Sequence, residues 1–224
     1  MIQFQGKHLD ALLASEVAPA WRGATPASWF GSVSKCAVGI NLPDHAQRRA
    51  DLRSYCLDPT ISTETCVIAV LAWGGMRVAN GRKAWRVRAD WIGEIERLRS
   101  SHNERSEDYD RLRGLRPKKL VGMRPAYFTK LLFFLRPSQD ALIMDQWTAK
   151  SIQLLTGERR PRLLRGNVSD ANTGQDYGWY CRAVEGVATR GGWTSQETEE
   201  RLFSGGGRQP GAWRAYVKHY WRSL

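Results

Sequence analysis

The stretch "RPAYFTKLLFFL", residues 124–135, is almost continuously apolar and carries one lysine, Lys130, near its centre. Proline is accepted in the first turn of a helix, and a helix that is apolar on nearly every face is a buried one. The segment therefore predicts a core helix, which Pro137 ends. Burying a lysine is costly unless it is paired or used, and desolvation favours its neutral, nucleophilic amine. The alternative is a lysine whose methylenes cover apolar surface while its amine reaches solvent.

The next segment, "DQWTAKSIQLLTG" at residues 145–157, has the signals of a helix at both ends. Asp145 is a favoured N-cap residue and Gly157 a favoured C-cap residue. Capping alone would account for this aspartate. The helix that carries Lys130 is nevertheless followed by a short turn with a proline and then by an apolar segment that leads to Asp145. This order brings an amine and a carboxylate back to the same region. We interpret that combination as a candidate catalytic pair.

Outward from these two segments, most of the chain has helical patterns and weak strand signals. Further helices are expected within 61–75, 89–101, 109–115, 177–192, 195–207 and 212–224. A turn is expected at 80–83, a solvated linker at 101–110, a polar loop at 159–174 and a flexible connection at Gly205–Gly207. The predicted fold class is mostly α, with two helical lobes around a basic cleft. We assign residues 1–60 to an N-terminal segment that packs on the core and residues 61–224 to one helical domain.

Composition and charge limit the classes of function that the chain could have. The chain has 224 residues, of which 42% are hydrophobic, and a formal net charge of +12. Residues 77–136 hold 16 Lys and Arg against 7 Asp and Glu, a net charge of +9. Such a field attracts polyanions, and nucleic acid is the first candidate; a basic surface that only maintains solubility is the alternative. The apolar runs are too short for a membrane span and the N-terminus is too polar for a secretory signal, so we expect a cytoplasmic protein.

Metal and cofactor signals are absent from the sequence. The cysteines and histidines have no metal-type spacing, which indicates buried reduced thiols and neither a metal nor another cofactor. These residues are Cys36, Cys56, Cys66, Cys181, His8, His45, His102 and His219.

The segments "LVGMRPAYFTKLLFFL" and "ALIMDQWTAKSIQLLTG" resemble the helix-hairpin-helix superfamily of DNA glycosylases. The resemblance is to its small bacterial members with the OGG (8-oxoguanine glycosylase-like) fold. "VLAWGG" and "RLFSGG" are also similar to this family, and the likeness extends from about residue 60 to the end. It implies a helix-hairpin-helix, OGG-like fold, double-stranded DNA with a modified base as partner, base flipping and a monomeric enzyme without a cofactor.

Carried over by position, the resemblance implies Lys130 as the catalytic amine and Asp145 as the catalytic carboxylate. Gly122, in the hairpin, would let backbone N–H groups approach a DNA phosphate. Lys118, Lys119 and Arg124 would bind DNA beside it. The sequence departs from the family in two ways: "GMR" lacks the second glycine of the usual hairpin, and the lysine lies deeper in its helix, as in archaeal 8-oxoguanine glycosylases.

The sequence leaves open which base is excised and whether strand cleavage by a lyase step follows. The family includes enzymes that excise 8-oxoguanine for repair, some with lyase activity. It also includes anti-phage glycosylases that remove glucosylated 5-hydroxymethylcytosine and leave an abasic site. The short, basic chain, lacking the extra N-terminal domain of eukaryotic repair enzymes, favours the second reading. A non-catalytic helical DNA-binding module, or an RNA-binding protein, would explain the charge but not a lysine within "YFTKLLFF".

Overall fold

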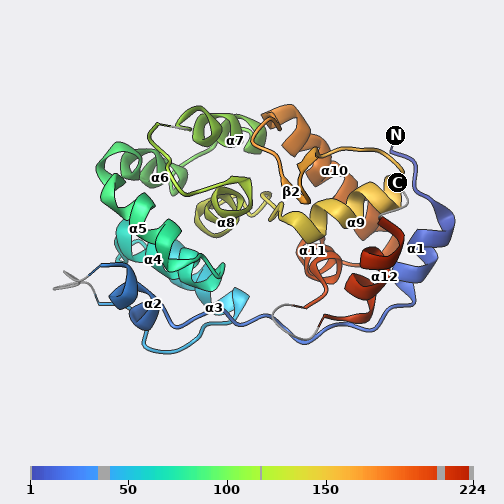
Figure 1. Ribbon diagram of the computed structural model, residues 1–224, viewed down its shortest axis with the longest axis horizontal. Coiled ribbons are helices and arrows are strands. Elements are labelled where there is room, and N and C mark those ends of the chain that lie inside the picture. Colours follow the sequence, from blue (N-terminus) through green and yellow to red (C-terminus); the bar gives the residue numbers. More distant parts are fainter. Residues whose placement is uncertain (1, 35–40, 117, 206–209, 222–224) are drawn as a thin grey trace. The chain divides into compact units, whose positions relative to one another are not determined.

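The computed structural model describes residues 2–34, 41–116, 118–205 and 210–221 (Figure 1). These residues form twelve α-helices, one short 3-10 helix and one two-stranded sheet, which confirms the predicted mostly α fold. The chain divides into two compact units, one of Arg22–Ala141 and one of Met1–Trp21 with Leu142–Leu224. The predicted domain boundary at residue 60 and the basic cleft stay predictions.

The unit of Arg22–Ala141 is built around α8, which contacts α3, α4, α6 and α7 (Figure 1). Its elements are α2 (Pro26–Val33), α3 (Arg49–Leu57), α4 (Thr63–Trp73), α5 (Val78–Arg86), η1 (Arg88–Asp90), α6 (Ile92–Leu98), α7 (Arg105–Gly114) and α8 (Pro125–Leu135). Pro125 occupies the first turn of α8, and every residue from Phe128 to Leu135 is buried. Helix α4, capped by Ser62, is buried along its whole length except at Glu64.

The other unit is built around α9, which contacts α1, α10, α11, α12 and β2 (Figure 1). Its elements are α1 (Gly6–Leu13), α9 (Gln146–Thr156), β1 (Leu163–Leu164), β2 (Asn167–Val168), α10 (Gly174–Gly191), α11 (Ser195–Phe203) and α12 (Ala212–Tyr220). Residues near the N-terminus join this unit because the Gln5 N–H donates to the Leu155 carbonyl at 2.7 Å.

Three predicted irregular segments are in fact regular. The expected turn at 80–83 lies inside α5, where Gly81 is needed because a Cβ would lie 2.8 Å from the side chains of Trp29 and Val33 on α2. The expected linker at 101–110 contributes the first six residues of α7. The expected loop at 159–174 contains the β1–β2 hairpin, in which Leu163 pairs with Val168. Of the expected glycine connection, Gly206 and Gly207 lie outside the described residues.

Candidate functional site

Asp145 is placed by hydrogen bonds from its own helix. Its Oδ1 accepts from the backbone N–H of Trp147 at 2.7 Å and of Thr148 at 3.1 Å, and Thr148 Oγ1 accepts from the Asp145 N–H at 3.0 Å. These bonds form a capping box at the N-terminus of α9, as the sequence predicts. The helix dipole adds positive potential at this end, which stabilises the ionised carboxylate.

The second carboxylate oxygen of Asp145 is differently placed. Oδ2 accepts no hydrogen bond from any residue that the structure describes, although the residue is only 8% exposed. One oxygen is therefore fixed by the helix, while the other keeps its hydrogen-bonding capacity for a bound molecule. A carboxylate held in this way can stabilise a developing positive charge without reorganising.

Two tyrosines of α10 hold the segment that leads into Asp145. Tyr177 Oη lies 3.0 Å from the Leu142 nitrogen and 2.8 Å from the Leu142 oxygen, and Tyr180 Oη donates to the Ile143 carbonyl at 2.7 Å. Burial raises the pKa of both phenols well above the ordinary value. Both side chains therefore stay neutral, and they fix the backbone two and three residues before Asp145.

A buried arginine that sequence reasoning missed lies near this aspartate. Arg214 of α12 donates through Nε and Nη2 to the Phe203 carbonyl at 2.9 and 2.5 Å, and its guanidinium lies 4.9 Å from the ring centroid of Trp147. Burial lowers the pKa of Arg214, and the Asp145 carboxylate partly offsets that shift. The helical pattern contains a signal for it, because Arg214 falls beside Trp213 and Val217 on the buried face of α12.

Lys130 lies in the middle of α8 and is 8% exposed, which confirms a buried lysine. Its Nζ donates to the Ala126 carbonyl at 2.8 Å and lies 5.6 Å from the ring centroid of Tyr127. Its methylenes cross the end of α4, where a Cβ on Gly74 would lie 2.8 Å from the lysine Cδ. The absence of a side chain at Gly74 thus leaves the space that the lysine stem occupies.

The loop between α7 and α8, where the resemblance implies the hairpin, carries the other predicted site residues. Lys118, Lys119 and Arg124 are exposed, and Gly122 has φ +82°, a conformation that favours glycine. A Cβ on Gly122 would also lie 2.7 Å from the carbonyl oxygen of Asn80, so packing against α5 is a second reason for glycine here. The sequence alone indicates only the approach of the backbone to a phosphate.

The backbone of this hairpin presents unpaired donors. The amide N–H groups of Val121, Gly122 and Met123 donate no hydrogen bond to any residue in the described part of the chain. The Arg116 guanidinium donates to the Met123 carbonyl and braces the loop. Consecutive backbone amides without partners in a turn are a feature of anion-binding sites in proteins.

The predicted residues are thus divided between the two units. Lys118, Lys119, Gly122, Arg124 and Lys130 belong to the unit of Arg22–Ala141. Asp145 belongs to the other unit.

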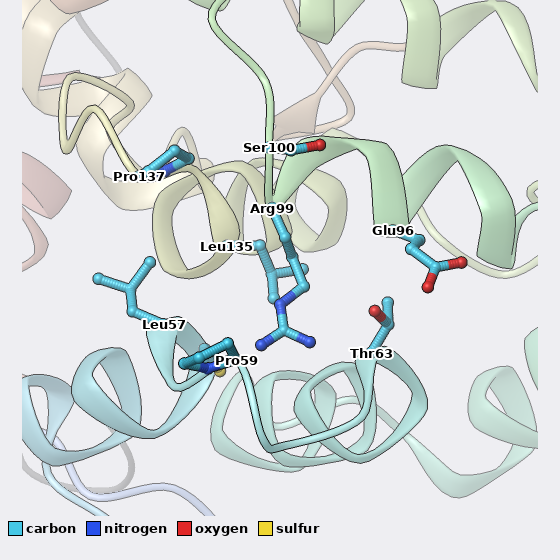
Figure 2. A pocket seen from close by; sticks show the side chains of 9 residues that line it. Leu57, Pro59, Thr63, Glu96, Arg99, Ser100, Leu135 and Pro137 are labelled. Atoms are coloured by element: carbon cyan, nitrogen blue, oxygen red, sulfur yellow. The ribbon is translucent and has the colours of Figure 1, made fainter.

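A cavity of about 400 Å³ lies elsewhere in the unit of Arg22–Ala141, and its lining includes Leu57, Thr63, Arg99 and Leu135 (Figure 2). Figure 2 shows Arg99 reaching toward the loop between α3 and α4, where its guanidinium donates to the carbonyls of Ile61 at 2.6 Å and Asp58 at 2.5 Å. Arg99 therefore ties α6 to that loop. None of the predicted site residues lines this cavity.

Two further observations concern metals and membranes. Among the described residues, no three His, Cys, Asp or Glu side chains are grouped as a metal site would require. Cys56, Cys66 and Cys181 are buried and form no disulfide within the described ranges, and Cys36 lies outside the described residues. No helix in the described ranges has the length and apolar character needed to cross a membrane.

Comparison with known proteins gives one match. Residues 17–203 match the family described as "Putative 8-oxoguanine DNA glycosylase OGG-like protein". No curated protein and no solved structure matches the chain. The family match covers most of the chain, including α7, the hairpin, α8 and α9, and it indicates a DNA glycosylase. The chain belongs to the 8-oxoguanine DNA glycosylase OGG-like family.

Proposed function

We propose that this protein flips a modified nucleotide out of double-stranded DNA and cleaves its N-glycosidic bond, with Asp145 as the catalytic carboxylate. The observation that carries the proposal is the state of that carboxylate: Oδ1 is held by two backbone amides, and Oδ2 accepts no hydrogen bond among the described residues. As the base leaves with the bonding electron pair, positive charge develops on the sugar. A fixed carboxylate oxygen stabilises that charge.

Lys130 is the proposed nucleophile. Its deprotonated Nζ would form a bond to the sugar C1′ while the bond from C1′ to the base breaks, and the departing base takes up a proton. Opening of the sugar ring then gives an imine, from which the strand can be cleaved. To react, Nζ must give up its hydrogen bond to the Ala126 carbonyl. If water attacks C1′ instead, the product is an intact abasic site and Lys130 serves only to position groups.

The hairpin supports the proposed mode of DNA binding. The free amides of Val121, Gly122 and Met123 suit a phosphate oxygen, and exposed Lys118 and Lys119 add positive charge on the same loop. We propose that this loop holds the strand backbone and that the protein acts as a monomer.

For the substrate, we propose glucosylated 5-hydroxymethylcytosine in phage DNA, on the resemblance to small anti-phage glycosylases. A second candidate is 8-oxoguanine, which the description of the matched family favours. Excision of either base breaks the same bond at C1′, so the proposed role of Asp145 does not depend on this choice.

One assay tests the proposal and separates the substrates. The protein is incubated with three duplexes of identical sequence that carry glucosylated 5-hydroxymethylcytosine, 8-oxoguanine or no modification, and abasic sites are counted. We expect abasic sites in the glucosylated duplex only; release of 8-oxoguanine alone would select the repair function. If no base is released from any duplex but the protein binds all three tightly, the protein is a DNA-binding module and not a glycosylase.

The same reactions run in borohydride test the lysine. Reduction of the imine converts it to a stable amine that links protein and DNA, so an adduct supports attack by Lys130. Base release without an adduct selects the water route.

A further inference from the structure

A second basic surface lies on the unit that contains Asp145. The β1–β2 hairpin, α9 and the residue after α12 enclose a groove of about 660 Å³. We call it the hairpin groove and define it by Gln153, Arg159, Arg162, Leu164, Arg165 and Trp221. None of these residues is among the site residues predicted from the sequence, because the segment of the β1–β2 hairpin was expected to be a polar loop.

The lining of the hairpin groove is positive. Of its nine lining residues, three are exposed arginines and none is acidic. Arg162 lies 3.5 Å from Asp176, whereas Arg165 makes no ion pair with any residue that the structure describes. Arg165 has φ +51° and Gly166 has φ +76°, so the turn at the hairpin tip holds this arginine out on the surface.

Apolar and aromatic surface lies beside the arginines. Leu164 is 62% exposed, which makes it one of the few exposed large hydrophobic residues described. The Trp221 indole donates through Nε1 to Gln153 Oε1 at 2.7 Å, and this bond fixes its ring at the edge of the groove. Positive charge interleaved with apolar and aromatic surface suits a nucleic-acid strand, which presents phosphates together with sugars and bases.

A row of cation–π contacts leads from this groove toward Asp145. Lys150 Nζ lies 4.7 Å from the ring centroid of Trp221 and 4.6 Å from that of Trp147, and the Arg214 guanidinium lies 4.9 Å from Trp147 on the same row. The Trp147 amide donates to Asp145 Oδ1. The hairpin groove and the candidate catalytic carboxylate are thus joined along one side of α9.

We infer that the hairpin groove binds phosphates of the DNA strand at a set distance from the excised base, an inference that rests on the proposed glycosylase function. Gln153 follows Asp145 by eight residues of α9, or about 12 Å at the helical rise. With α9 taken to run along the strand, and about 3.4 Å of DNA axis per phosphate of one strand, the groove contacts phosphates roughly three to four base pairs from the target. The DNA contact proposed above for the loop between α7 and α8 is a separate one.

The test uses the full chain with the substitutions R159Q, R162Q and R165Q combined. Affinity for a duplex is measured by fluorescence anisotropy at several salt concentrations. The slope of log K against log salt is negative, and each lost phosphate contact reduces its magnitude by about 0.9. For the triple variant we therefore expect a reduction in magnitude of about 2 to 3. The matched control, R182Q, R190Q and K218Q combined, removes three exposed cations of the same unit that do not line the groove. Its slope should change by less than about 1.

A second variant and a second measurement guard against misfolding. Arg165→Gln alone changes an exposed hairpin tip and should lower the slope by about 0.9. The duplex is then shortened from each end in turn. Shortening from one end, but not from the other, should abolish the difference in salt slope between wild type and the triple variant. The difference should vanish once fewer than about three base pairs remain on that side of the target. An unchanged slope in both variants, or a difference that survives shortening from either end, would overturn the inference.

The two proposals fail in different ways. If the wild-type protein releases a modified base but the groove variants bind with an unchanged salt slope, only the groove is excluded. If no base is released and the slope still falls, the groove binds DNA and the glycosylase proposal fails. Binding of an acidic protein in the groove in place of DNA would leave the slope unchanged and count against the inference.

Discussion

Helices α8 and α9 are the central helices of their two units, yet they hold their candidate catalytic residues by opposite means. The Asp145 carboxylate is held by hydrogen bonds from residues two and three positions later, so its side chain is positioned within its own helix. Lys130 bonds to its own helix at Ala126, but its stem depends on the space above Gly74 of α4. The difference teaches that the position of the aspartate side chain is set by residues next to it in the sequence, whereas the position of the lysine side chain depends on how helices pack.

The largest effect is expected at Asp145, where charge and capping can be separated. Asparagine is as good an N-cap as aspartate, so Asp145→Asn should keep the stability while base release falls about 10³-fold. Asp145→Ala should lose the same activity and, in addition, about 1 kcal/mol of unfolding free energy. Single-turnover base release and urea unfolding measure the two effects. Wild-type release by Asp145→Asn would remove the carboxylate from the mechanism.

Substitution of Lys130 should affect chemistry without affecting the fold. Lys130→Met replaces the amine by an unbranched apolar side chain that fits a buried site, so urea unfolding should show no loss of stability. Base release should fall about 10²-fold and the borohydride adduct should disappear. An adduct of undiminished yield would mean that another amine attacks the sugar.

Gly74 tests the tertiary dependence of the lysine directly. In Gly74→Ala the new Cβ would lie 2.8 Å from the Lys130 Cδ, so the side chain must shift. We expect adduct yield to fall about tenfold, by analogy with other displaced catalytic groups, and stability to fall by about 1 to 3 kcal/mol. Gly93→Ala in α6 is the control, since a Cβ there meets no atom within 4 Å. That control should leave adduct yield unchanged; equal losses in both variants would contradict the packing argument.

The smallest effect concerns α10, which has the same kind of local cap as α9. Burial alone would raise the pKa of Asp176, but hydrogen bonds from Thr173 and the charges of Arg160 and Arg162 lower it below the ordinary value of 3.8. A lowered carboxyl pKa stabilises the folded state above the unfolded pKa, and the stabilisation is lost as the pH falls through the folded pKa. Wild type should therefore exceed Asp176→Asn in unfolding free energy at pH 7, with the difference shrinking below pH 3.8. A pH-independent difference in urea unfolding would show that the charge of Asp176 is not responsible.

The sequence predicted the elements whose signals lie within a few residues of one another. Helix α9 begins after Asp145 and ends before Gly157, where the capping chemistry of these two residues indicates. Two errors have different causes. Gly81 indicates a turn by its local pattern, but it lies within α5, where α2 packs against it. The 163–168 hairpin is local, but its strands have only two residues each, too few to show an alternating pattern.

The sequence by itself determined that Asp145 caps a helix and that Lys130 lies within an apolar one, because capping and helical periodicity act between residues one turn apart. Only the tertiary structure decided that Gly74 makes room for the lysine stem, that α10 tyrosines hold the backbone before Asp145, and that a hairpin lines a basic groove. Those outcomes depend on which helix surfaces meet, and close packing between distant segments has no local pattern in the chain.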